Sequence, residues 1–164
     1  MSATCERGSV CSVETRSACC AGPDVIRAFL SGFVGTMAIT LMMYFVAPIM
    51  VGTKMDIAQM LGSLVRDSWW AGLGMHFVNG TIVFPLLYTF VFYSVLPGGS
   101  TMKGITWGVI LWVLAQIAVM PMMGAGFFSA NSGGLMAAIA SLLGHLVYGW
   151  VLGFFAGSPR VVSA

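Results

Sequence analysis

The charged residues of this chain are confined to short stretches, and their placement restricts the chain to a fold that spans a membrane. No Asp, Glu, Lys or Arg occurs between Asp67 and Lys103, or between Lys103 and Arg160. Only 7% of the 164 residues are charged, whereas soluble domains carry about 25%. This composition excludes an ordinary soluble enzyme, a disordered chain and a protein that binds nucleic acid through a basic face.

The uncharged stretches are long enough to cross a bilayer four times. A transmembrane helix needs about 20 apolar residues, and the stretch after Lys103 provides two such segments, separated by the turn-rich residues 129–134. The apolar runs are continuous and do not alternate with polar residues, as the strands of a barrel would. We therefore expect an all-α, polytopic membrane protein with spans at about 28–50, 70–95, 104–127 and 135–156.

The segments outside the spans predict the limits of the domain and its orientation. Residues 25–157 form the expected four-helix transmembrane domain, after a disordered tail at 1–24 and before a C-terminal tail at 158–164. Four spans place both termini on one side, and that side carries five of the seven basic residues. The positive-inside rule then places both termini in the cytoplasm. The connector at 55–65 has apolar residues at helical spacing and predicts either a short interfacial helix or an ordinary connector.

Two short motifs indicate that the spans form a duplicated helix hairpin. Residues 76–80 read H-F-V-N-G and residues 145–149 read H-L-V-Y-G, and they contain the only two histidines of the chain. Spans one and three also share Gly, Leu, Val, Pro and Met at a constant offset of 73 residues, beginning with Gly35 and Gly108. This pattern predicts a parallel repeat that brings the two histidines to similar depth in the membrane.

Polar residues near the two histidines complete a candidate site. Asn79 and Tyr148 each follow a histidine by three residues and share its helix face, and Gln116 lies near the middle of span three. The histidines His76 and His145 have two interpretations: a ligand site inside the membrane, or hydrogen bonds that only hold helices together.

Glycines beside these histidines predict close contacts. Gly80 and Gly149 each follow a histidine by four residues and therefore lie next to it on the helix. Gly153 continues this small-residue spacing along span four. Such glycines either leave room for a ligand or let two helix backbones approach.

Sulfur-containing residues are the candidate ligands of a soft metal. Cys19 and Cys20 are adjacent in the tail and would bind a metal as thiolates. Thioethers are offered near the end of span three by Met120, Met122 and Met123. The alternatives are incidental cysteines in a tail and methionines that fill space between apolar helices.

Short sequences in the hairpins and their connector carry a resemblance to a known family. They are G-F-V-G-T at residues 32–36, K-M-D-I-A at residues 54–58, and the two H-x-V-x-G motifs. Through them, residues 28–157 resemble a family of small four-helix bacterial membrane proteins of unknown function. The resemblance implies the four-span fold and a bacterial inner-membrane location, and it implies no reaction.

These observations favour three functions. The first is a non-enzymatic membrane protein that acts as an accessory or self-assembling subunit, because the chain contains no hydrolytic, redox or phosphate-binding motif. The second is a protein that binds haem b or a soft metal through His76 and His145. The third is a small transporter for a neutral solute or a soft metal. The expected partners are the lipid bilayer and a second copy or a membrane-complex subunit, and no nucleic acid.

Overall fold

The computed structural model describes residues 23–52 and 55–157, and the regular structure of this part of the chain is helical, without strands. Four helices in it are long and apolar enough to cross a membrane: Val25–Val51, Trp69–Val95, Ser100–Met122 and Gly134–Ala156. The predicted all-α, four-span fold is confirmed. Cys19, Cys20 and the C-terminal tail lie outside the described residues.

Three of the four spans change helix type along their length. The first consists of α2 (Val25–Leu41), the π-helical segment η1 (Met42–Val46) and α3 (Ala47–Val51). The second consists of α5 (Trp69–Val78), η2 (Asn79–Val83), α6 (Phe84–Leu87), η3 (Tyr88–Phe92) and α7 (Tyr93–Val95). The third consists of α8 (Ser100–Leu114), η4 (Ala115–Val119) and α9 (Met120–Met122), and the fourth is the single helix α10 (Gly134–Ala156).

Prolines account for three of these changes. Pro48, Pro85 and Pro121 each stand two residues after a π-helical segment ends. A proline has no N–H, so it leaves a carbonyl of the preceding turn without its usual partner, and a local π-turn is one way to accommodate this. The segments η1 and η4 occupy residues 42–46 and 115–119, which are again 73 residues apart. The helix distortions thus recur at the offset of the sequence repeat.

The third span differs from its predicted limits at both ends. It ends at Met122 and not near 127, because Gly124 and Gly126 adopt positive φ angles of 77° and 75° that carry the chain out of the helix. It begins at Ser100, four residues before the predicted start at 104, and so includes Lys103. The Lys103 Nζ donates to the carbonyl oxygen of Tyr93 at 2.6 Å, which places the charge at the helix end.

The helix α10 is the centre of the bundle and packs against both α8 and α2. Its contact with α8 is a backbone contact, since a Cβ added to Gly149 would collide with the carbonyl oxygen of Gly104. A Cβ on Gly153 would lie 2.6 Å from the Ser100 carbonyl oxygen. Gly149 and Gly153 therefore hold two helices of one chain together.

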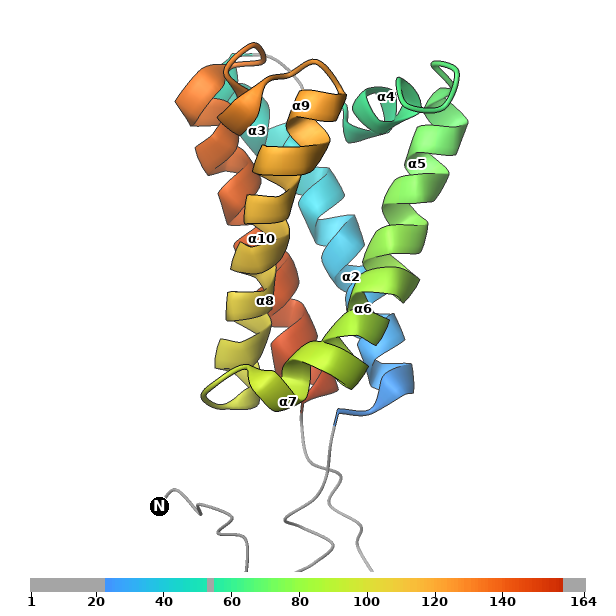
Figure 1. Ribbon diagram of the computed structural model, residues 1–164, viewed down its shortest axis with the longest axis vertical. Helices are drawn as coiled ribbons and strands as arrows, with labels where there is room; N and C mark the ends of the chain where they lie inside the picture. Colours follow the sequence, from blue (N-terminus) through green and yellow to red (C-terminus); the bar gives the residue numbers. More distant parts are fainter. Residues whose placement is uncertain (1–22, 53–54, 158–164) are drawn as a thin grey trace, which may run out of the picture.

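The two hairpins are packed differently, as Figure 1 shows. The helices α8 and α10 run side by side, whereas α5 diverges from them toward one end of the bundle. A short helix, α4 (Ile57–Gly62), lies across that end and packs against α5. We call this the α4 end. At the opposite, terminal end, the N–H of Asp24 donates to the carbonyl oxygen of Ala156 at 3.2 Å.

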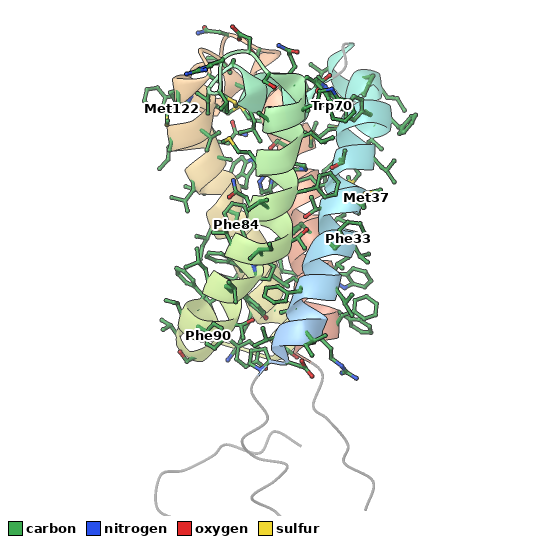
Figure 2. The ribbon with its side chains drawn as sticks, turned by 90° about the vertical axis from the view of Figure 1, so that its right-hand side faces the viewer. Phe33, Met37, Trp70, Phe84, Phe90 and Met122 are labelled. Carbon is green, nitrogen blue, oxygen red and sulfur yellow. The ribbon has the colours of Figure 1, made fainter. Side chains whose placement is uncertain are left out.

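The outer surface of the bundle is apolar along its length. Large side chains at different levels are exposed, including Phe33, Met37, Trp70, Phe90 and Met122 (Figure 2). Trp70 is 77% exposed and stands at the start of α5, where an indole fits the membrane interface. A bilayer is the environment in which such a surface is stable.

Candidate functional site

A cavity of about 280 Å³ lies inside the half of the bundle near the α4 end, and residues of all four spans line it. Its walls are mostly apolar side chains. Its polar lining residues are Thr36, His76, Asn79, Ser141, His145 and Tyr148. The cavity lies where α5 diverges from α8 and α10, and α2, which packs against both α10 and η2, forms a further part of its wall (Figure 1).

His145 on α10 enters the cavity in one defined tautomer. Its Nδ1 lies 2.8 Å from the carbonyl oxygen of Ser141, one turn earlier on the same helix. A carbonyl oxygen only accepts, so Nδ1 must carry the proton and donate it. This leaves Nε2 as the nitrogen with a free lone pair, provided that the ring is neutral.

His76 on α5 takes the opposite tautomer because of its neighbour on α2. Its Nε2 lies 3.0 Å from the hydroxyl oxygen of Thr40. The single hydroxyl proton of Thr40 is donated to the carbonyl oxygen of Thr36 at 2.7 Å. The Thr40 oxygen therefore accepts from His76, Nε2 carries the proton, and Nδ1 keeps the free lone pair.

Both imidazoles are neutral on this assignment, because none of the described residues that line the cavity is acidic. A charged imidazolium in an apolar interior without a counter-ion would be strongly unfavourable. No described residue bonds to Nδ1 of His76 or Nε2 of His145. Fully enclosed polar atoms without a partner occur, within the described part, on Thr81, Thr89, Trp107 and Gln116. The two free nitrogens are not among these enclosed atoms, and both histidines line the cavity.

The two H-x-V-x-G motifs touch each other across the bundle. Tyr148 of the second motif donates its hydroxyl proton to the carbonyl oxygen of Gly80 in the first at 2.6 Å. Gly80 itself contacts span one, since an added Cβ would collide with the hydroxyl oxygen of Thr36. Gly149 contacts span three in the same manner, so each motif glycine packs against the first helix of its own hairpin.

The structure places the two remaining polar candidates, Asn79 and Gln116, in different surroundings. Asn79 is half-buried and lines the cavity close to His76 in sequence. Gln116 is fully buried but does not line the cavity, and its Oε1 accepts a hydrogen bond from the Ser129 hydroxyl at 3.1 Å. The expectation that Gln116 would join the histidines is not met, because it lies on a different face of its span from Leu114 and Ala115, which do line the cavity.

The helix α4 closes the cavity at its end of the bundle. Met55, Ile57, Met60 and Leu61 from this segment line the cavity. The helix is seated tightly on α5, because a Cβ on Gly72 would collide with the carbonyl oxygen of Ala58. Of the two interpretations of the 55–65 connector, the structure has a short helix at residues 57–62.

The carboxylate of Asp56 connects the start of α4 to spans one and two through hydrogen bonds. Asp56 accepts hydrogen bonds from the Tyr44 hydroxyl at 2.6 Å, the Trp69 Nε1 at 3.1 Å and the backbone N–H of Gln59 at 3.0 Å. Partial burial acts to raise the pKa of Asp56, but these hydrogen bonds outweigh it and hold the pKa below its ordinary value of 3.8. We call Asp56, Tyr44 and Trp69 the Asp56 cluster.

Four methionines line the same cavity as the two histidines, namely Met43, Met55, Met60 and Met120. Of the three methionines singled out in the sequence, only Met120 is among them. Met122 is 69% exposed on the outer surface, and Met123 does not line the cavity. The described residues contain no group of three or more His, Cys, Asp or Glu side chains placed to hold a metal ion.

The cavity is too small to enclose haem, and none of the described residues that line it is a lysine or arginine that could pair with the haem propionates. A cavity of about 150 Å³ is filled by one benzene ring, so about 280 Å³ has room for fewer than two such rings. A porphyrin has four pyrrole rings joined in a single plane. In addition, Nε2 of His76 is engaged by Thr40.

Several residues of the site were not found from the sequence. Ser141 precedes His145 by four residues, a spacing that would have indicated a contact on the same helix. Thr40 belongs to another span, and no pattern in the chain connects it to His76. Asp56 stands directly before a helical apolar pattern, which is a typical N-cap position and the one available signal for it.

Comparisons with known proteins agree with the resemblance noted in the sequence. The model of a family described as "Family of unknown function (DUF6789)" matches residues 23–159, which include all four spans. No curated protein and no solved structure matches the chain.

Proposed function

Because the chain belongs to DUF6789, a family of unknown function, we propose its function from the cavity: it is a non-enzymatic membrane protein that binds a small, mostly apolar molecule inside its helix bundle. The observation that carries the proposal is the meeting of the chain's two histidines at one cavity, each with an unpartnered nitrogen. Polar groups that converge in an otherwise apolar cavity are typical of ligand sites.

The proposal includes a setting for this binding. We place the protein in the inner membrane of a bacterium with both termini in the cytoplasm, which the five-to-two distribution of basic residues supports. We also propose an accessory role, in which the bound molecule or a second membrane subunit is the partner. A reporter fused after residue 164 should be active only if that reporter works in the cytoplasm.

Ligand-dependent stabilisation tests the binding. A ligand at 100 times its dissociation constant stabilises the folded state by about 2.7 kcal/mol, which raises the Tm of a chain of this size by about 5–10 °C. We expect phenol or toluene to raise the Tm of the purified protein in detergent as the free ligand concentration increases.

Two matched substitutions on η4 test whether the rise in Tm comes from binding in the cavity. Ala115 lines the cavity, so Ala115→Phe should fill it and abolish the rise in Tm. Ile117 is exposed on the outer surface and does not line the cavity, so Ile117→Phe should keep the rise. No rise in the wild type, or an equal rise in both variants, would refute binding in this cavity.

A soft metal such as Cu(I) is the second candidate ligand, and the four methionines at the cavity favour it. Thioether sulfur and imidazole nitrogen are ligands that Cu(I) accepts. In a variant with Cys5, Cys11, Cys19 and Cys20 replaced by Ser, so that the tail thiols do not compete, metal analysis after exposure to Cu(I) should find about one ion per chain. The ion should be lost when Met43 and Met120 are both replaced by Leu, and retention of the ion in that variant would exclude this site.

A further inference from the structure

The hydrogen-bonding state of the cavity wall points to the class of ligand. We infer that the bound molecule carries a hydroxyl group on a small apolar body, as a membrane-soluble alcohol or phenol does. This inference rests on the proposed function, because it names what the same cavity binds.

The two imidazoles present acceptors to the cavity, and their donors are already used. The N–H of His145 is donated to the Ser141 carbonyl, and the N–H of His76 to the Thr40 hydroxyl oxygen. What remains is one lone pair on each ring. A hydrogen on oxygen or nitrogen is what an unprotonated imidazole nitrogen can bind, whereas an ether, a ketone or a hydrocarbon has no such proton to offer. An aliphatic amine is cationic at neutral pH and does not suit this apolar cavity, so the hydroxyl is the donor that we infer.

Two other hydroxyls of the wall, those of Tyr148 and Thr36, are also committed within the protein. Tyr148 donates to the Gly80 carbonyl oxygen, and Thr36 donates to the Gly32 carbonyl oxygen at 2.7 Å. Asn79 and the Ser141 hydroxyl, which lies 3.5 Å from Nδ1 of His145, can each both donate and accept, so they favour no ligand class. The cavity wall as a whole therefore favours a ligand that donates a hydrogen bond.

The volume limits the size of the ligand. Since about 150 Å³ holds one benzene ring, a cavity of about 280 Å³ accommodates a single ring with a short alkyl substituent. The apolar walls contact the ring, and the imidazoles contact its hydroxyl group.

Three ligands of similar size separate this inference from the proposed function: phenol, its methyl ether anisole, and toluene. Dissociation constants are measured with the purified wild-type protein from the rise in Tm, with free concentrations corrected for partition into detergent. One net hydrogen bond in a protein interior corresponds to about fivefold in affinity, so phenol should bind about fivefold more tightly than anisole or toluene.

Two variants test whether the imidazoles cause the preference for phenol. In the double variant His76→Phe, His145→Phe the three ligands should bind with equal affinity. Thr40→Val removes only the acceptor that fixes the tautomer of His76, so this milder variant should bind toluene as the wild type does while phenol loses part of its advantage.

Each result has a distinct meaning. Equal binding of phenol and anisole by the wild type, or a phenol preference that survives in the double variant, overturns the inference and leaves cavity binding intact. If none of the three ligands binds the folded wild type, the proposed function fails as well. Should the double variant not fold, an unchanged phenol preference in Thr40→Val overturns the proposed role of His76.

Discussion

Replacing Asp56 by Ala should loosen α4 from the rest of the bundle. The substitution removes the N-cap of α4, which is worth about 1 kcal/mol. It also removes the hydrogen bonds from Tyr44 and Trp69. Hydrogen bonds to a charged group contribute about 1.5–3 kcal/mol each, but water reaches this half-buried carboxylate, so we assign about 1 kcal/mol to the two together.

The expected loss of about 2 kcal/mol corresponds to about a 30-fold increase in the opening of α4. Hydrogen exchange measures this opening directly, through the amides of Met60 and Ser63, which bond to the carbonyls of Asp56 and Gln59. Their protection should fall about 30-fold in Asp56→Ala, while the amides in the middle of α10 keep theirs.

Asp56→Asn is the matched control. Asparagine caps a helix about as well as aspartate and keeps an acceptor oxygen, so the loss of protection should stay below about fivefold. Unchanged protection of α4 in Asp56→Ala would refute the role of the Asp56 cluster. An equal loss throughout α10 would show that the carboxylate stabilises the whole bundle and not α4 in particular.

Three further predictions follow from the contacts. The pKa of Asp56 is lower in the folded protein than its ordinary value of 3.8, so the stabilisation of α4 by this carboxylate is complete above 3.8 and is lost as pH falls through the lower folded value. The hydrogen-exchange protection factors of α4 should therefore be constant from pH 8 to about pH 5 and decrease only in stronger acid. Gly149→Leu should reduce the folded yield on size-exclusion chromatography, since overpacking costs about 1–3 kcal/mol or more, whereas Gly74→Leu should not, because nothing lies within 4 Å of a Cβ there. Tyr148→Phe leaves the Gly80 carbonyl without this donor and should lower the free energy of unfolding by about 1–2 kcal/mol in denaturant titrations.

The four spans could be predicted from the sequence because the bilayer interior offers the backbone no hydrogen-bond partners. A backbone inside hydrocarbon must satisfy its own hydrogen bonds, so long uncharged runs such as the one between Lys103 and Arg160 form helices. The end of the third span could not be predicted in this way. Residues 123–127 are apolar enough to continue it, and it is the backbone at Gly124 and Gly126 that ends the helix.

The histidine pair and the rest of the site show a second limit of sequence reasoning. The motifs drew attention to His76 and His145, but periodicity does not say which face of one helix meets which neighbour. The sequence therefore groups Gln116 with the histidines, whereas in the structure its Oε1 accepts a hydrogen bond from Ser129. Thr40 was missed because its contact with His76 joins residues 36 positions apart and arises only when α2 and α5 pack.

A structure of the protein with 4-bromophenol tests the central claim most directly, because bromine is located by its anomalous scattering. Our account predicts one bromine peak inside the cavity lined by His76 and His145, with the phenol oxygen within hydrogen-bonding distance of Nδ1 of His76 or Nε2 of His145. An empty cavity at saturating bromophenol, or peaks found only on the outer surface of the helices, would contradict it.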